Sequence, residues 1–234
     1  MKLAYQRLDN GETVAHVTLH GSNRDPRVLE WHRRVMVDHW GIPVNYVECP
    51  FHLGVSHGHC MNELLRATVD LLDAPIYVWL WDVDCILLRR DGLRHVIDTV
   101  KNRRTLWGTA WSSSHKAKPG GGKSHPYAGS PCVCFATDLY KTLGRPDCDH
   151  HNPRSDTIEE LSYACEERGF TLALAYPSSS DEPYTVQLSQ TCRYGRSIMY
   201  GVPPTFYHET RADLPGATER FIATCERLLR GEYE

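Results

Sequence analysis

The sequence lacks a long apolar run. Its 234 residues contain no stretch of about 18 apolar residues, the minimum for a helix that crosses a membrane. The first 16 residues also lack the apolar core of a secretion signal, so we expect none. The expected location is therefore the cytoplasm.

Paired cysteine motifs are also missing. The chain has nine cysteines but no C-x-x-C pair, and a zinc ribbon is therefore not expected. Reduced, buried thiols are typical of cytoplasmic proteins, and we expect these cysteines to be of that kind. Cys148, His150 and His151 lie close together in the sequence, but without a second pair of ligands we interpret them as loop residues.

The chain has little net charge, −3 from 26 basic and 29 acidic residues. The charge is nevertheless uneven. Residues 101–154 contain nine Lys or Arg and three Asp or Glu, so this segment carries +6 and the remainder carries −9. A basic segment on an acidic chain indicates an anionic ligand, although scattered solvated charge explains it equally well.

Strand and helix patterns alternate along the chain, which predicts an α/β fold with a mostly parallel sheet flanked by helices. Strands are expected at residues 13–20, 44–48, 76–81, 105–111, 132–136, 171–175 and 205–207. Helices are expected at 27–40, from 56 to 72, at 91–102 and 137–143, from 155 or 156 onward, and at 218–229, with a long loop over 112–130.

Two acidic residues, Asp82 and Asp84, directly follow the most apolar of these strands. Ligands of open α/β sheets bind at the carboxyl ends of strands. Two carboxylates spaced i, i+2 can face one hard cation, which would neutralise the phosphates of a nucleotide. A cap and turn without metal is the alternative. The pattern therefore predicts a site for Mn²⁺ or Mg²⁺ at Asp82 and Asp84.

With this motif, the chain resembles the GT-A glycosyltransferases, particularly the compact ones found in bacteria and their phages. The resemblance extends from the first strand to about Arg211, and only the D-x-D motif is a hallmark of the family. The other matching segments are residues 18–21, 56–58 with Asn62 and Arg66, 127–130, 156–160 and 207–209. The resemblance implies one Rossmann-like GT-A domain over 1–234, with a nucleotide-sugar and metal half at 1–100 and an acceptor half at 101–234.

The resemblance also implies which residues bind the donor, a nucleotide sugar that we expect to be a UDP-sugar. Thr18, Leu19 and His20 would contact the nucleoside. The start of the second helix would face the diphosphate, and a helix N-terminus does attract phosphate. The residues expected there, together with Asp82, are Ser56, His57, Gly58 and Arg66. A plain N-cap is the alternative for Ser56.

Two further roles follow from the resemblance. His208 would complete the metal site, because imidazole suits Mn²⁺ beside carboxylates; a hydrogen-bonded surface histidine is the alternative. An inverting enzyme needs a general base, for which the carboxylate cluster Asp156, Glu159 and Glu160 is the candidate, with Asp156 favoured. Acids in a first helical turn are also ordinary dipole complements, and a retaining enzyme would need no base.

The basic segment interleaves aromatic and basic side chains, a composition suited to phosphate contacts and base stacking. The residues expected to bind the acceptor are Trp111, Lys116, Lys118 and Tyr127. Some phage enzymes of this type resemble glycosyltransferases of 5-hydroxymethylcytosine, a base that must be extruded from DNA. DNA is therefore the leading acceptor, with a saccharide or a lipid-linked sugar as the alternative.

Other functions fit parts of the same pattern. A haloacid-dehalogenase-like phosphohydrolase also carries two aspartates after an apolar strand, but usually near its N-terminus. A sugar nucleotidyltransferase would have a richer glycine loop than residues 21–24. A binding module without turnover is the remaining alternative.

Overall fold

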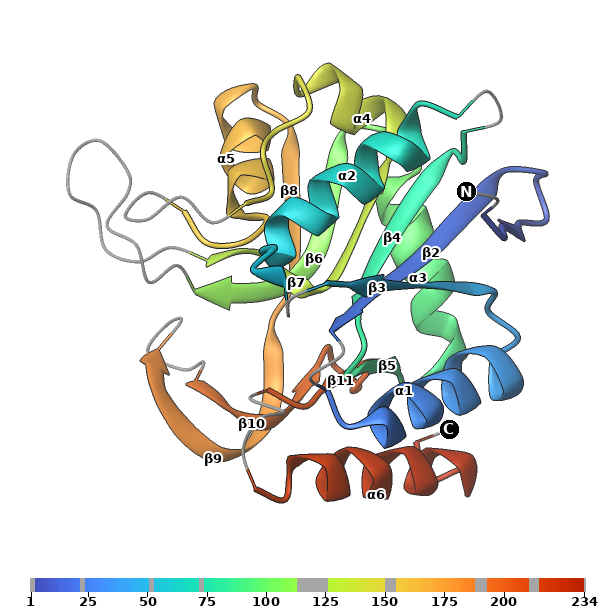
Figure 1. The fold of residues 1–234 in the computed structure, drawn as a ribbon, viewed down its shortest axis with the longest axis vertical. Coiled ribbons are helices and arrows are strands. Elements are labelled where there is room, and N and C mark those ends of the chain that lie inside the picture. The colour runs from blue at the N-terminus through green and yellow to red at the C-terminus, as the bar shows by residue number, and fades with distance from the viewer. Residues whose placement is uncertain are drawn as a thin grey trace.

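The central sheet is built from the apolar strands of the chain (Figure 1). The computed structural model describes residues 3–21, 24–50, 53–71, 74–112, 126–149, 155–187, 193–210 and 215–233. The strands of this sheet are β1 (Gln6–Arg7), β2 (Thr13–Gly21), β3 (Val44–Cys49), β4 (Tyr77–Asp82), β6 (Thr105–Ser112), β7 (Pro126–Ala136) and β8 (Thr171–Ala175). Their order is β1-β2-β4-β7-β6-β8, and β3 also pairs with β2.

The direction of the strands confirms the predicted sheet. β2, β3, β4, β6 and β8 run the same way, whereas β1 and β7 run against them. The sheet is therefore mixed and mostly parallel. The loop expected over residues 112–130 is wrong at its end, because β7 already begins at Pro126 and pairs with β6 there. Proline is tolerated at that position because it is the first residue of the strand.

A second, antiparallel sheet lies below the central one in Figure 1. It has the order β5 (Cys85–Leu87), β11 (Phe206–His208), β10 (Arg193–Tyr200) and β9 (Pro177–Gln187). Of these strands the sequence predicted only β11. The segment of β5 is short, and that of β9 is rich in serine and acidic residues, which are poor strand formers.

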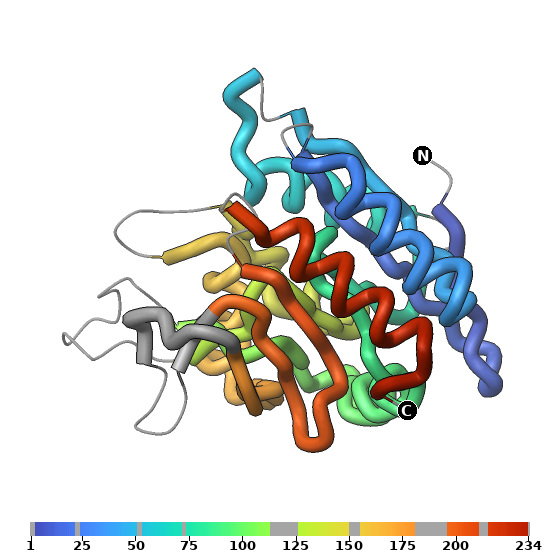
Figure 2. The backbone as a smooth tube through the Cα atoms, turned by 90° about the horizontal axis from the view of Figure 1, so that it is seen from below, coloured from blue at the N-terminus to red at the C-terminus, as the bar shows by residue number. Residues whose placement is uncertain are grey.

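The helices follow the predicted order. They are α1 (Pro26–Arg33), continued by the π-helical segment η1 (Arg34–His39), α2 (His57–Val69), α3 (Arg90–Val100), α4 (Thr137–Thr142), α5 (Glu159–Glu167) and α6 (Ala217–Leu229). Figure 1 shows α2 in front of the central sheet and α3 behind it. Helices α1 and α6 lie side by side next to the second sheet, as Figure 2 also shows.

Aromatic side chains join the two sheets. Trp79 and Trp81 of β4 are buried and stack with ring centroids 4.8 Å apart. Phe206 of β11 packs against both and against Trp107, with centroid distances of 5.0 to 6.3 Å. Such pairs add about 0.5–1.5 kcal/mol each beyond the burial of their area. The cluster therefore fixes β11, and with it the end of that strand, against the end of β4.

The expectation that all cysteines are reduced is wrong for one pair. Cys49 and Cys60 form a disulfide, because the end of β3 and the first turns of α2 bring their Cα atoms to 6.1 Å, within the range a disulfide spans. The other cysteines that the structure describes are free and buried, as expected. No helix in the described ranges is long and apolar enough to cross a membrane. The cytoplasmic location stays a prediction.

Candidate metal centre

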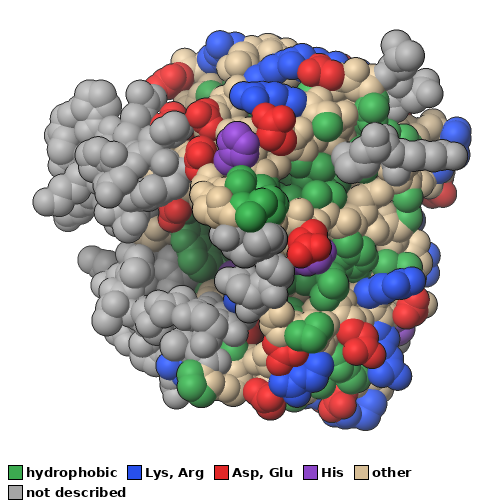
Figure 3. Space-filling view, in the orientation of Figure 1, with side chains coloured by type: hydrophobic (Ala, Val, Ile, Leu, Met, Phe, Trp, Pro, Cys, Tyr) green, Lys and Arg blue, Asp and Glu red, His purple; other side chains and the backbone are tan. Residues whose placement is uncertain are grey.

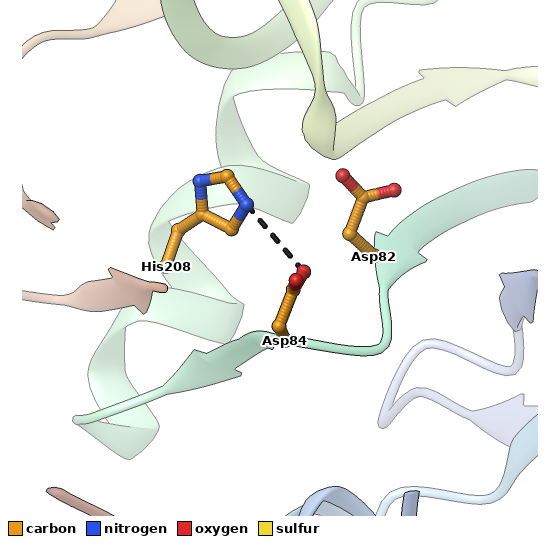
Figure 4. A group of neighbouring side chains, drawn as sticks. All are labelled: Asp82, Asp84 and His208. Atoms are coloured by element: carbon orange, nitrogen blue, oxygen red, sulfur yellow. Dashed lines mark ion pairs between the residues drawn. The ribbon is translucent and has the colours of Figure 1, made fainter. Parts of the chain in front are cut away.

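Three side chains converge at the carboxyl end of β4. Asp82 is the last residue of β4, Asp84 lies in the turn before β5, and His208 is the last residue of β11. One potential ligand atom from each lies within 4.8 Å of the others. Figure 4 shows the two carboxylates and the imidazole pointing toward one another. The predicted ligands of a divalent cation thus lie together.

Strand pairing explains why His208 is at this place. β5 and β11 are antiparallel, with Cys85 opposite His208. The amide of Glu209 donates to the carbonyl oxygen of Asp84 at 3.0 Å and continues the ladder by one residue. The first half of the chain supplies the aspartates and the second half supplies the histidine.

The cluster is charged, and two of its three side chains, Asp84 and His208, are buried, whereas Asp82 is half-buried. The side chain of Asp84 is 2% exposed; its Oδ1 lies 3.5 Å from Nε2 of His208 and its Oδ2 lies 3.4 Å from a guanidinium nitrogen of Arg24. Burial raises the pKa of Asp84, but His208 and Arg24 outweigh it and hold the pKa below its usual value. Burial raises the pKa of Asp82 above its usual value, and the charge of His57 offsets this only in part.

The residues fit a divalent cation. Oδ1 of Asp84 and Nδ1 of His208 are buried and have no hydrogen-bond partner among the described residues. Buried polar atoms without partners are uncommon, and the binding of an ion is one ordinary reason for them. Two carboxylates and one imidazole form a donor set that suits Mn²⁺, and carboxylates also bind Mg²⁺.

Side chains from β6 and β7 border the cluster. The Ser130 hydroxyl donates to Oδ2 of Asp82 at 3.3 Å. The ring of Trp111 meets the His208 ring edge-on, with centroids 5.8 Å apart. A Cβ on Gly129 would lie 2.5 Å from Cβ of Trp111, so this packing requires glycine. Trp111, which the sequence places with the acceptor, therefore lies next to the candidate metal ligands.

The residues expected to bind the nucleoside lie on β2, beside β4. Leu19 is opposite Asp82 in the parallel ladder, and Thr18 is opposite Trp81. Thr18 is buried, and its hydroxyl has no hydrogen-bond partner within the described part of the chain. His20 is half-buried and pairs with Glu48 of β3. Both strands thus end at the same edge of the sheet as the metal cluster.

The start of α2 is built around a cap. The Ser56 hydroxyl oxygen accepts from the amide of His59 at 3.0 Å and donates to Asp149 at 2.7 Å. A Cβ on Gly58 would lie 2.3 Å from the Cα of Asp149, so only glycine allows this close approach. The helix start therefore packs against the segment around Asp149, while the charge of neighbouring His57 acts on Asp82. Arg66 is 56% exposed and pairs with Glu63 on the outer face.

The candidate bases lie at the start of α5. Glu159 is fully buried; one carboxylate oxygen accepts from the amide of Asp156 at 2.8 Å and the other accepts from the Tyr163 hydroxyl at 2.5 Å. The first of these bonds is half of a capping box. Asp156 is only half-buried, and its Oδ2 lies 3.4 Å from the Tyr127 hydroxyl. The structure thus brings together Asp156 and Tyr127, which the sequence assigns to the base and to the acceptor.

Some of the predicted residues lie outside the described ranges, and some residues near the site were not predicted. Lys116, Lys118, His150 and His151 lie outside the described residues. Sequence reasoning missed three residues near the site: Arg24, Asp149 and His32. The imidazole of His32 is buried, and the charge of Asp84 acts on it to raise its pKa, against the larger effect of burial. The sequence weakly indicated Arg24, because this residue lies in the loop that follows the first predicted strand. The other two depend on how distant segments pack.

Comparison with known proteins supports the fold. No family model and no curated protein matches the sequence. The galactosyltransferase LgtC, solved in complex with donor and acceptor sugar analogues, is 11% identical over 91% of this chain and 95% of that one, with a TM-score of 0.51. An active-site mutant of LgtC is 12% identical over 93% and 95%, with a TM-score of 0.50. The chain therefore has the fold of the GT-A glycosyltransferases, a mixed and mostly parallel sheet flanked by helices.

Proposed function

We propose that the protein is a metal-dependent glycosyltransferase that moves a sugar from a nucleotide sugar, a UDP-sugar, to a hydroxyl group. The observation that carries this proposal is the cluster of Asp82, Asp84 and His208 at the carboxyl end of β4, in which Asp84 and His208 are buried and Asp82 is half-buried. That edge is where open α/β sheets bind their ligands. The fold supports a transferase over a haloacid-dehalogenase-like phosphohydrolase, because the similar structures are glycosyltransferases.

The residues of the site divide between donor and metal. Asp82, Asp84 and His208 would hold Mn²⁺ or Mg²⁺, which supplies positive charge to the departing nucleotide diphosphate. Thr18, Leu19 and His20 lie near the end of β2 beside Asp82 and would contact the nucleoside. His57 would complete this side, since it is close enough to Asp82 to affect its pKa.

Asp156 is the proposed general base of an inverting reaction. Its carboxylate would take the proton of the acceptor hydroxyl while the acceptor oxygen bonds to the anomeric carbon of the sugar. The bond from that carbon to the diphosphate oxygen breaks, and its electron pair leaves with the nucleoside diphosphate. Both oxygens of Glu159 are already engaged by Asp156 and Tyr163, so Glu159 is better suited to hold the loop than to accept a proton.

A sugar hydroxyl is the acceptor we favour. Three of the five described basic residues of segment 101–154 are paired with acids: Lys101 with Asp98, Arg103 with Glu12 and Asp138, and Arg145 with Asp70. Figure 3 likewise shows basic and acidic side chains interspersed on the visible face. One LgtC structure contains an acceptor sugar analogue. The DNA acceptor, 5-hydroxymethylcytosine, remains the second proposal, because the two lysines that suggest it lie outside the described residues.

A donor-hydrolysis assay tests the proposed activity. Glycosyltransferases slowly release the nucleoside diphosphate from their donor in water, so the protein with Mn²⁺ should release UDP from one UDP-sugar of a panel. EDTA should abolish the release. Inorganic phosphate as the product would instead support a phosphohydrolase, and the absence of any product with any nucleotide sugar would support a binding module.

A further inference from the structure

Arg24 forms an ion pair with Asp84, one of the candidate metal ligands. Its guanidinium lies 3.4 Å from Oδ2 of Asp84, and its side chain is 37% exposed. Asp84 itself is 2% exposed. The guanidinium thus has one side on the buried carboxylate and another side on solvent.

The contact between Arg24 and Asp84 is loose. Charge-assisted hydrogen bonds are about 2.7–2.9 Å long. Other arginines of this protein reach such contacts, for example Arg27 with Asp25 at 2.6 Å and Arg220 with Glu209 at 2.6 Å. The guanidinium of Arg24 has no hydrogen-bond partner among the described residues, although it carries five N–H donors. With respect to the described part of the chain, its donors are available for a planar anion.

The backbone fixes Arg24 at the carboxyl end of β2. The amide of Arg24 donates to the carbonyl oxygen of Gly21 at 3.2 Å, directly after β2 ends. The next residue, Asp25, caps α1 by accepting from the amide of Arg27 at 3.0 Å. The backbone of Arg24 is thus held between the end of β2 and the start of α1, which places its side chain beside Asp84.

Charge decides what Arg24 can pair with. Without a cation, Arg24 and the cluster carry one positive charge beside two carboxylates. A divalent cation on the same carboxylates would cancel their two negative charges and remove their attraction for the guanidinium. The anion that then fits is a diphosphate, because the planar guanidinium can donate two parallel hydrogen bonds to phosphate oxygens.

We propose that Arg24 is a diphosphate-binding residue of this site, and that it partly occupies the place of the cation beside Asp84 until metal and nucleotide bind. This proposal rests on the proposed function. It makes two opposite predictions for one substitution. Removal of the charge should strengthen the binding of the cation alone and weaken the binding of the nucleoside diphosphate. Substitution of a residue that only supports the structure would not change the affinities for the cation and for the diphosphate in opposite directions.

Calorimetric titration of the purified full chain tests the proposal. Mn²⁺ alone is titrated first into the wild type, Arg24→Gln, Arg24→Lys and Arg27→Gln. UDP, GDP, ADP and CDP are then titrated at saturating Mn²⁺, with uridine as a probe that has no phosphate. Arg27 is the matched control, because it lies in the same segment but pairs with Asp25 and Glu219 instead of Asp84.

We expect Arg24→Gln to bind Mn²⁺ about threefold to tenfold tighter and the preferred diphosphate about tenfold or more weakly, as for a lost hydrogen bond to a charged group. Arg24→Lys should recover part of the affinity for the diphosphate. Arg27→Gln should bind Mn²⁺ and the diphosphate as the wild type does, and the affinity for uridine should be the same in all variants. Unchanged diphosphate affinity in Arg24→Gln overturns the proposal, and so does a parallel loss of Mn²⁺ and diphosphate. If the wild type binds neither Mn²⁺ nor any diphosphate, the proposed function fails as well.

Discussion

Nε2 of His208 lies 3.5 Å from Oδ1 of Asp84, although the two residues come from opposite halves of the chain. The pairing of β5 with β11 creates this contact, because it sets Cys85 opposite His208. The candidate metal centre therefore depends on the second sheet as much as on β4.

Loss of the histidine should weaken the cation site. We expect His208→Gln to lower the affinity for Mn²⁺ by at least about tenfold, since the loss of even a supporting partner of a metal ligand costs about 10- to 100-fold. Titration of Mn²⁺ followed by the electron paramagnetic resonance of the free ion measures this affinity. His39→Gln is the control, because His39 is exposed at the end of η1. Equal affinities in the two variants would remove His208 from the site.

Substitution of Asp156 should separate transfer from donor binding. Asp156→Asn is expected to slow glycosyl transfer by about 10²- to 10⁴-fold, the usual contribution of a general base. The affinity for the nucleotide should stay unchanged, since the Asp156 carboxylate lies beside the Tyr127 hydroxyl and the start of α5. Glu167→Gln, on the exposed face of α5, should leave both unchanged. A transfer rate near that of the wild type in Asp156→Asn would point to a retaining reaction without this base.

Two buried histidines should make the fold sensitive to mild acid. Burial lowers the pKa of His16 to about 3 and that of His32 to about 4, while both should titrate near 6.5 in the unfolded chain. Their stabilising contribution is complete above pH 6.5 and is lost as the pH falls toward these folded-state values. As the pH falls from 7.5 to 5, each of the two histidines should lower the unfolding free energy by about 2 kcal/mol.

Urea unfolding at several pH values measures this loss. His16→Gln should show a smaller fall than the wild type over the same range, even if it is less stable throughout. Imidazole NMR shifts give a second readout. The Trp81 indole N–H donates to Nδ1 of His16 at 3.2 Å, and Oε1 of Gln6 lies 2.7 Å from Nε2. Because Nδ1 accepts and Nε2 faces an acceptor, this arrangement favours a neutral ring protonated at Nε2. A His16 ring that is charged at pH 5 in the folded protein would contradict the account.

The disulfide between Cys49 and Cys60 should be detectable chemically. Alkylation in denaturant without reductant should label two thiols fewer than alkylation after reduction. Its removal in Cys60→Ser should lower the unfolding free energy by about 2–3 kcal/mol, in line with a short closed loop. If all nine cysteines react without reductant, the pair is reduced in the isolated protein and the original expectation holds.

The sequence predicted the parts of the fold that local pattern controls. The apolar run of β4 and the acids at its end predicted the buried strand and the position of Asp82 and Asp84 at its carboxyl end, because burial and strand-end position can be read along the chain. Ser56 was predicted as the start of α2, and its side chain caps that helix. Helix α5 was expected to start at 155 or 156 but begins at Glu159, whose carboxylate closes the turn from Asp156.

What the sequence could not predict depends on long-range pairing. The place of His208 is set by β5, a strand of three residues with too little pattern to be recognised. The contact of Arg24 with Asp84 and that of Ser56 with Asp149 join segments whose approach no periodicity encodes. Cys49 and Cys60 differ from the other cysteines only by meeting across β3 and α2.

Thermal unfolding with nucleotide sugars and Mn²⁺ tests the central claim most directly. A ligand at 100 times its dissociation constant stabilises by about 2.7 kcal/mol, which should raise the Tm of a chain of this size by about 5–10 °C. We predict this rise for the wild type with one UDP-sugar and Mn²⁺, and for the control Asp98→Asn on the exposed face of α3, but not after addition of EDTA and not for Asp84→Asn. A rise of the same size in Asp84→Asn would contradict the assignment of Asp84 as a ligand of the cation that holds the donor.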